Sequence, residues 1–161
     1  MLLDQQRQEM LDFVTSLPLD DLYKKPTADA WDILHILAHL ALFEKSAAKN
    51  VHEALLEKNY VDDITQKPVH LAADHSKKVK TKSKWEPTAA HYSLEEVAAS
   101  LAETRKSLQA ALAHATEEDL NNIVIHTDSF GDLSLAQYVD FINYHEARHF
   151  EQIKMNASLD V

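Results

Sequence analysis

The chain has 161 residues, 45% of them hydrophobic, which fits a single globular domain spanning residues 1–161 with a sizeable core. It contains no cysteine, which excludes disulfides and thiolate metal sites, and its formal net charge of −10 disfavours nucleic-acid binding. The N-terminus turns polar within four residues and no apolar run could span a bilayer, so we expect a cytoplasmic protein without a signal peptide or membrane contact.

Helices dominate the predicted secondary structure, because the chain has only one Gly and four Pro among long stretches rich in Ala, Leu, Glu and Lys. A first helix is predicted from about Leu2 to Pro18. A second should begin near Trp31, with Asp29 as its capping residue, and run to about Glu57. Its first half is apolar almost all round, which indicates burial.

The second half of the chain predicts two more helices after an irregular segment. Residues 60–92 show no clear period and carry a lysine run from Lys77 to Lys84, so we interpret them as a long crossover. Ser93 to Glu96 forms a capping box that opens a third helix through about His114, and a fourth is predicted from Ser134 to Met155. The predicted fold is therefore an all-α four-helix bundle with a long crossover between helices two and three.

A pair of histidines in the last predicted helix is the most informative feature of the chain. His145 and His149 are four residues apart and fall on the apolar stripe of that helix, within roughly 60° of its centre at 100° per residue. The same stripe contains Leu135, Tyr138, Ile142 and Ile153. Two imidazoles in a core position would lose hydrogen bonds and repel when protonated, unless one divalent ion binds both.

The identity of a third ligand is open at this point. Asp32, His35 and His39 share one stripe of the second helix, and His39 is the better choice because it lies one turn deeper in the apolar helix. The alternative is that the three residues form the hydrated side of a buried helix. The segment from His145 to His149 also matches the H-E-x-x-H pattern of zinc peptidases. That interpretation is disfavoured, because such enzymes take their third ligand from downstream and only twelve residues follow His149.

Three segments resemble the DinB-like superfamily of bacterial damage-inducible proteins and thiol transferases, which is distinct from the DNA polymerase of similar name. They are Trp31-Asp-Ile-Leu-His-Ile-Leu-Ala-His39-Leu, Phe130-Gly-Asp-Leu, and His145-Glu-Ala-Arg-His149-Phe-Glu-Gln-Ile153. The resemblance implies a four-helix bundle, often a homodimer, that binds zinc or nickel through His39, His145 and His149. His35 departs from the family pattern and stays open as a fourth or alternative ligand.

The resemblance also implies a function, which is metal-dependent transfer of a low-molecular-weight thiol to electrophiles in detoxification or stress response. Glu146, about 40° off the stripe, is a candidate partner of the ligands or proton acceptor, and the alternative is a solvated flanking carboxylate. The lysine run can bind the carboxylates of an anionic thiol or form a solvated loop. A metal-binding stress-response bundle without turnover and a metal-dependent hydrolase are the competing functions.

Overall fold

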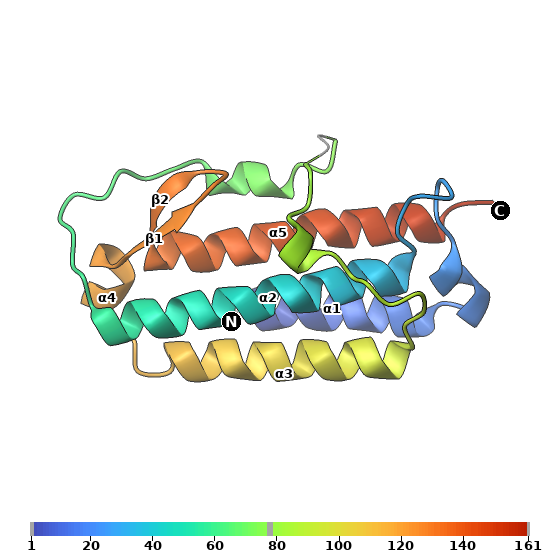
Figure 1. Cartoon of the computed structure of the whole chain (residues 1–161), viewed down its shortest axis with the longest axis horizontal. Coiled ribbons are helices and arrows are strands. Elements are labelled where there is room, and N and C mark those ends of the chain that lie inside the picture. The colour runs from blue at the N-terminus through green and yellow to red at the C-terminus, as the bar shows by residue number, and fades with distance from the viewer. Residues whose placement is uncertain (1, 77–78, 161) are drawn as a thin grey trace.

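Four long helices form the body of the protein in a computed structural model that describes residues 2–76 and 79–160. They are α1 (Leu2–Ser16), α2 (Ile33–Glu57), α3 (Leu94–Leu112) and α5 (Leu135–Ala157), and Figure 1 shows them packed side by side. The helices lie close to their predicted positions, which confirms the predicted four-helix bundle. The helix α1 is much shorter than α2, about 22 Å against 37 Å at 1.5 Å per residue.

The direction of the helices follows from the long crossover between α2 and α3. In Figure 1 the chain leaves the left end of α2, returns along the length of the bundle, and enters α3 at the right, so α2 and α3 run the same way. The helices α1 and α5 run the opposite way. Two short 3₁₀ turns, η2 (Val69–Ala73) and η3 (Ser83–Trp85), interrupt the crossover, and a third, η1 (Leu19–Tyr23), joins α1 to α2.

Capping residues set where the helices begin. The predicted box at α3 is confirmed, since the Ser93 side chain accepts from the backbone of Glu96 and the Glu96 carboxylate accepts from the backbone of Ser93. The cap predicted for α2 was wrong. Asp32, rather than Asp29, is the N-cap, and its side chain accepts from the backbone N–H of His35.

The connection between α3 and α5 contains structure that the sequence interpretation missed. It holds a short helix, α4 (Glu117–Asn122), and an antiparallel hairpin of β1 (Val124–Thr127) and β2 (Gly131–Ser134). The only glycine of the chain, Gly131, has a φ of +71° in this hairpin, a conformation that L residues rarely adopt. The scarcity of glycine had argued against strands, yet the single glycine lies where a hairpin needs one.

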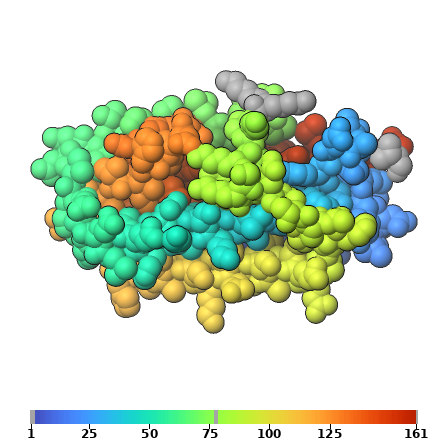
Figure 2. Space-filling model, in the orientation of Figure 1, coloured from blue at the N-terminus to red at the C-terminus, as the bar shows by residue number. Residues whose placement is uncertain are grey.

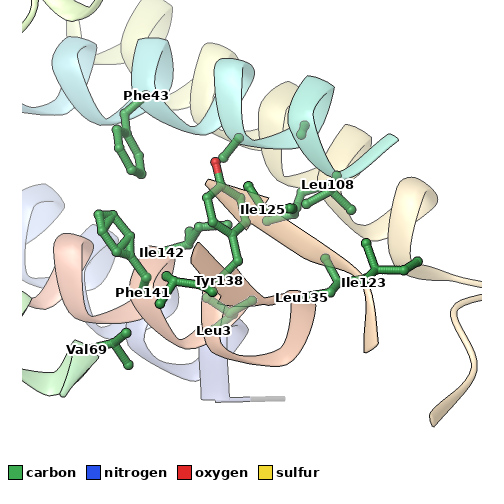
Figure 3. Close-up of a cluster of buried hydrophobic side chains, with 14 residues drawn as sticks. Leu3, Phe43, Val69, Leu108, Ile123, Ile125, Leu135, Tyr138, Phe141 and Ile142 are labelled. Carbon is green, nitrogen blue, oxygen red and sulfur yellow. The ribbon is translucent and has the colours of Figure 1, made fainter. Parts of the chain in front are cut away.

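The hydrophobic core extends along the bundle and encloses the face that α2 and α5 share. Figure 3 shows Phe43 of α2 opposite Phe141 of α5, with Tyr138 and Ile142 beside them. The Phe43 and Phe141 rings are stacked with centroids 5.9 Å apart. Among the described residues, no helix is long and apolar enough to cross a membrane. The shared face of α2 and α5 also positions the candidate site.

Candidate metal centre

Three histidines from two helices meet inside the bundle. His39 comes from α2, and His145 and His149 come from α5, one turn apart. Each has a ring nitrogen within 4.8 Å of a ring nitrogen of the other two. The ring centroids are 5.3 Å apart for His39 and His145, and 4.7 Å apart for His39 and His149. The tertiary fold therefore brings together the three residues that the family resemblance named.

Hydrogen bonds at the outer edge of two rings determine which nitrogen faces inward. His39 Nδ1 lies 2.9 Å from the Trp85 carbonyl oxygen, which can only accept, so Nδ1 carries the proton in the neutral ring. His39 Nε2 is then left with a free lone pair, and it is buried without a hydrogen-bond partner. His149 Nδ1 lies 2.8 Å from Gln152 Oε1, which can only accept, so Nδ1 carries the proton and the lone pair is on Nε2. Such outer partners typically orient metal-binding histidines.

The surroundings of the rings keep them neutral. Burial lowers the pKa of His39, although its hydrogen bond to Trp85 acts in the other direction. Burial, with the charges of His149, His39 and Arg148, lowers the pKa of His145 well below 6.5. Burial and the nearby His39 also lower the pKa of His149 to about 3, against the hydrogen bond to Gln152. Neutral imidazole is the form that coordinates metal ions.

The site fits a divalent transition ion. Zinc–nitrogen bonds are about 2.0–2.1 Å long, so nitrogens within 4.8 Å of one another converge on an ion after shifts of less than about 1 Å per ring. The buried Nδ1 of His145 also lacks a hydrogen-bond partner. Unpartnered polar atoms inside a core are costly, and coordination would satisfy at least the Nε2 of His39. Three histidines can thus form a metal site here.

Aromatic rings surround the three histidines and restrict access to them. Trp31 lies 5.0 Å from the His39 ring, and Phe43 stacks on His145 with centroids 3.9 Å apart. His39 is only 2% exposed, and His149 is buried as well. The turn η3 lies across α2 in Figures 1 and 2, where its Trp85 carbonyl reaches His39. An ion in this site would lie in a medium of low polarity.

His35, which the sequence left open as a fourth or alternative ligand, is engaged elsewhere. Its Nδ1 lies 2.7 Å from the Asp32 carboxylate and its Nε2 lies 3.0 Å from the Ala89 carbonyl oxygen. Both ring nitrogens therefore have partners, and Asp32 itself caps α2. The pair fastens the crossover to the start of α2, and His35 is absent from the group of nitrogens around His39.

Glu146, for which the sequence left two interpretations, is buried between the helices. The solvated alternative was wrong, because the side chain is buried. Its two carboxylate oxygens accept hydrogen bonds from Arg7 and Gln6 of α1, at 2.6 and 3.2 Å. A role as proton acceptor beside the histidines finds no support in these contacts. Glu146 belongs instead to a separate cluster of charged residues between the helices.

The lysine run is divided between different surroundings, and Lys77 and Lys78 lie outside the described residues. Lys82 forms an ion pair with Asp128, which lowers the pKa of that carboxyl. Lys82 and Lys84 both lie over the Trp85 ring, at 5.4 and 4.7 Å from its centre. The run therefore lies partly above the residue that contacts His39, which keeps it a candidate for binding an anionic ligand.

The hydrogen-bond partners of the ligand rings were not predicted from the sequence, and only one of them left a local signal. Gln152 follows His149 by three residues, and that spacing places the two side chains on neighbouring positions of one helix surface. The contact of Trp85 with His39 joins positions 46 residues apart through an irregular segment. No periodic pattern could have predicted it.

Comparison with known proteins identifies the family of this chain. Residues 2–153 match the family described as the DinB superfamily. The chain belongs to the DinB superfamily. Among its relatives, the uncharacterized protein YuaE of Bacillus subtilis is 32% identical over 148 residues, which cover 92% of this chain and 90% of that one.

A solved structure supports the fold of this DinB-superfamily chain. The crystal structure of TT2238, a four-helix bundle protein, aligns with a TM-score of 0.66 over 96% of this chain and 94% of that one. Sequence identity is 22%, so the likeness concerns the fold alone. The predicted family membership and the predicted fold are thereby confirmed.

Proposed function

We propose that this DinB-superfamily chain binds one zinc or nickel ion through His39, His145 and His149. The observation that carries this proposal is the convergence of three histidine ring nitrogens, within 4.8 Å of one another, on rings that burial keeps neutral. Three protein ligands leave a fourth position free, which distinguishes catalytic from structural zinc sites. The site therefore suits an exchangeable ligand.

We further propose that the exchangeable ligand is a low-molecular-weight thiol, which the protein transfers to an electrophile in detoxification or stress response. A bound divalent ion would lower the pKa of a coordinating thiol and orient its sulfur. Trp31 and Phe43 pack on the rings of His39 and His145 and would keep water from the ion. The Trp85 carbonyl and Gln152 orient the rings of His39 and His149 through hydrogen bonds. Lys84, above the Trp85 ring, can bind a carboxylate of the thiol.

A metal-binding bundle without turnover is the second candidate function. The observation that favours it is the near-complete enclosure of His39 and His149. If the enclosed site accepts a metal ion but no thiol, this second function is the better account.

Metal content tests the ligand set. Elemental analysis of the purified protein should give about one zinc or nickel ion per chain, and His149→Ala should lose most of it. His35→Ala is the matched control, since His35 lies one turn before His39 on the same helix and contacts Asp32 and Ala89. Equal metal content in His149→Ala and the parent would contradict the proposal.

Thiol transfer is tested separately with bacillithiol, mycothiol, glutathione and coenzyme A. Each thiol is assayed with apo and metal-loaded protein against a chlorinated aromatic and an epoxide. We expect metal-dependent turnover with one of the thiols and a perturbed absorption spectrum of the cobalt-substituted site. If no thiol gives either signal, transfer is refuted while metal binding stands.

We also propose that the protein is a homodimer. A groove of about 1160 Å³ lies between α2 and α3, with Lys45 and Lys49 on its α2 side and Glu96 and Glu103 on its α3 side. A two-fold axis would place the basic side of one copy against the acidic side of the other. Light scattering should show a dimer that Lys49→Glu weakens and that Lys49→Glu with Glu103→Lys restores.

A further inference from the structure

A cluster of four buried charged residues joins all four long helices. Arg7 comes from α1, Glu44 from α2, Arg105 from α3 and Glu146 from α5. Their side chains are almost inaccessible, with residue exposures of 7%, 2%, 6% and 2% respectively. Two guanidinium groups face two carboxylates, so the formal charges of the cluster cancel. None of the four residues was singled out as a partner of another by the sequence pattern.

Arg7 connects the two helices carrying the histidines through short hydrogen bonds to both carboxylates. Its Nη2 donates to Glu44 Oε2 of α2 and its Nε donates to Glu146 Oε1 of α5, both at 2.6 Å. The remaining Nη1 donates to the Leu101 carbonyl oxygen of α3 at 3.1 Å. One planar guanidinium therefore fixes both carboxylates relative to a third helix, which the single ammonium of a lysine could not do with the same geometry.

Arg105 supports the same carboxylates from the opposite side. It donates to both oxygens of Glu44 at 3.1 Å, and its Nη2 lies 3.6 Å from Glu146 Oε1. Burial works to lower the pKa of Arg105, but its hydrogen bond to Glu44 and the charges of Glu44 and Glu146 raise it. The guanidinium of Arg105 therefore stays charged inside the bundle.

The cluster is close to the histidines in sequence but faces another side of each helix. Glu146 lies between His145 and His149, and at 100° per residue it points about 100° away from the first and about 60° from the second. Glu44 follows His39 by five residues, which places it about 140° away. The helices α2 and α5 are therefore tied together at Arg7 and face each other at the histidines.

Rotation of either helix would disturb the convergence of the three rings. A ring nitrogen lies roughly 7 Å from the helix axis, so a rotation of about 20° moves it on the order of 2 Å. Metal–ligand distances tolerate deviations of only about 0.2 Å. Without Arg7, moreover, Glu44 and Glu146 would be left with one guanidinium between two buried carboxylates, which favours separation of α2 and α5.

We propose that Arg7 is a positioning residue for the metal centre, because it clamps Glu44 of α2 to Glu146 of α5 and so fixes the rotation at which His39 meets His145 and His149. This inference rests on the proposed metal site. In this inference Glu146 holds α5 in position through its hydrogen bond to Arg7 and does not transfer a proton. Buried ion pairs are weak sources of net stability, so a geometric role accounts better for burying four charges.

Cobalt absorption and zinc affinity of the full chain test this role, since both report coordination geometry and neither requires turnover. The variants are Arg7→Met, which removes the link between Glu44 and Glu146, and Arg7→Lys, which keeps the positive charge. Arg7→Lys is the variant to measure if Arg7→Met does not fold. Met10→Ala is the matched control, because Met10 is fully buried on α1 and belongs to a hydrophobic cluster. It should lower the melting temperature without touching the charged residues.

Both Arg7 variants should shift the visible cobalt bands and weaken zinc binding about tenfold to a hundredfold, the usual effect of changing groups that orient metal ligands. Met10→Ala should keep the parent spectrum and affinity while losing stability. Folded Arg7→Lys with the parent spectrum and affinity would overturn the positioning role alone. A parent protein that binds neither cobalt nor zinc would overturn the metal site itself, and the positioning role with it.

Discussion

The metal-free protein should lose stability as the pH falls from 7 to 5, because its core histidines resist protonation only when the chain is folded. His149 has a pKa of about 3 in the folded protein, against 6.5 for an unperturbed histidine. Below pH 6.5 the unfolded chain binds a proton at this residue and the folded chain does not. The stabilising contribution is therefore present above pH 6.5 and is lost as the pH falls toward about 3.

The size of this loss follows from the shift in pKa. One pKa unit corresponds to about 1.4 kcal/mol, so at pH 5 the unfolded state gains about 2 kcal/mol from protonation of His149 alone. His39 and His145 add to the loss in the same direction, because burial lowers both of their pKa values. Domains of this kind are stable by only about 5–15 kcal/mol, so the effect is a large fraction of the total.

Urea unfolding in the presence of a chelator measures the effect. The free energy of unfolding should fall between pH 7 and pH 5 in the parent, and the fall should be about 2 kcal/mol smaller in His149→Gln, which has no imidazole to titrate. His114→Gln is the matched control, because it makes the same replacement at an exposed histidine just beyond the end of α3. If His149→Gln keeps the full pH dependence of the parent, the reasoning about buried neutral rings is wrong.

Three further predictions concern the same structure. Tyr60 should ionise at about pH 12 in an ultraviolet titration because its hydroxyl donates to Asp119, and the stability that this raised pKa contributes should be lost between about pH 10 and 12. Ionisation of Tyr60 near pH 10 in the parent, or an unchanged titration in Asp119→Asn, would contradict this. Zinc at 100 times its Kd should add about 2.7 kcal/mol to the free energy of unfolding and raise the Tm by roughly 5–10 °C. This stabilisation should vanish in His145→Ala, and if it persists there, His145 is not a ligand. Ser93→Ala should lower the free energy of unfolding in urea by about 1 kcal/mol, because it removes the N-cap of α3. Ser100→Ala, inside the same helix, should lower it clearly less, and equal losses in the two variants would argue against the cap.

The helices and the ligand candidates were accessible to sequence reasoning because they depend on local periodicity. An apolar stripe repeats every three to four residues, so the pattern alone was enough to place His145 and His149 on the buried side of α5. The capping box at Ser93 is likewise a local signal, and it was confirmed. The hairpin was missed, although the segment from Ile123 to Thr127, in which four of five residues are β-branched, was a usable sign of it ahead of Gly131.

Contacts between distant segments were beyond the sequence for a physical reason. Periodicity states which side of a helix is buried, but it does not state which side of another helix lies opposite. The meeting of His39 with the α5 pair came from a family resemblance, and the fold brings the three rings together. The contact of His35 with Ala89 depends on where the crossover returns, and that path has no period.

The cluster of Arg7, Glu44, Arg105 and Glu146 separates most clearly what helix periodicity determines from what tertiary packing determines. The sequence by itself determined that Glu146 points about 100° away from His145 and about 60° away from His149, since 100° per residue is a property of any α-helix. Only the tertiary structure decided whether that carboxylate meets water or an arginine. Arg7 is separated from Glu146 by 139 positions in the chain, and packing of four helices is what brings the two within 2.6 Å.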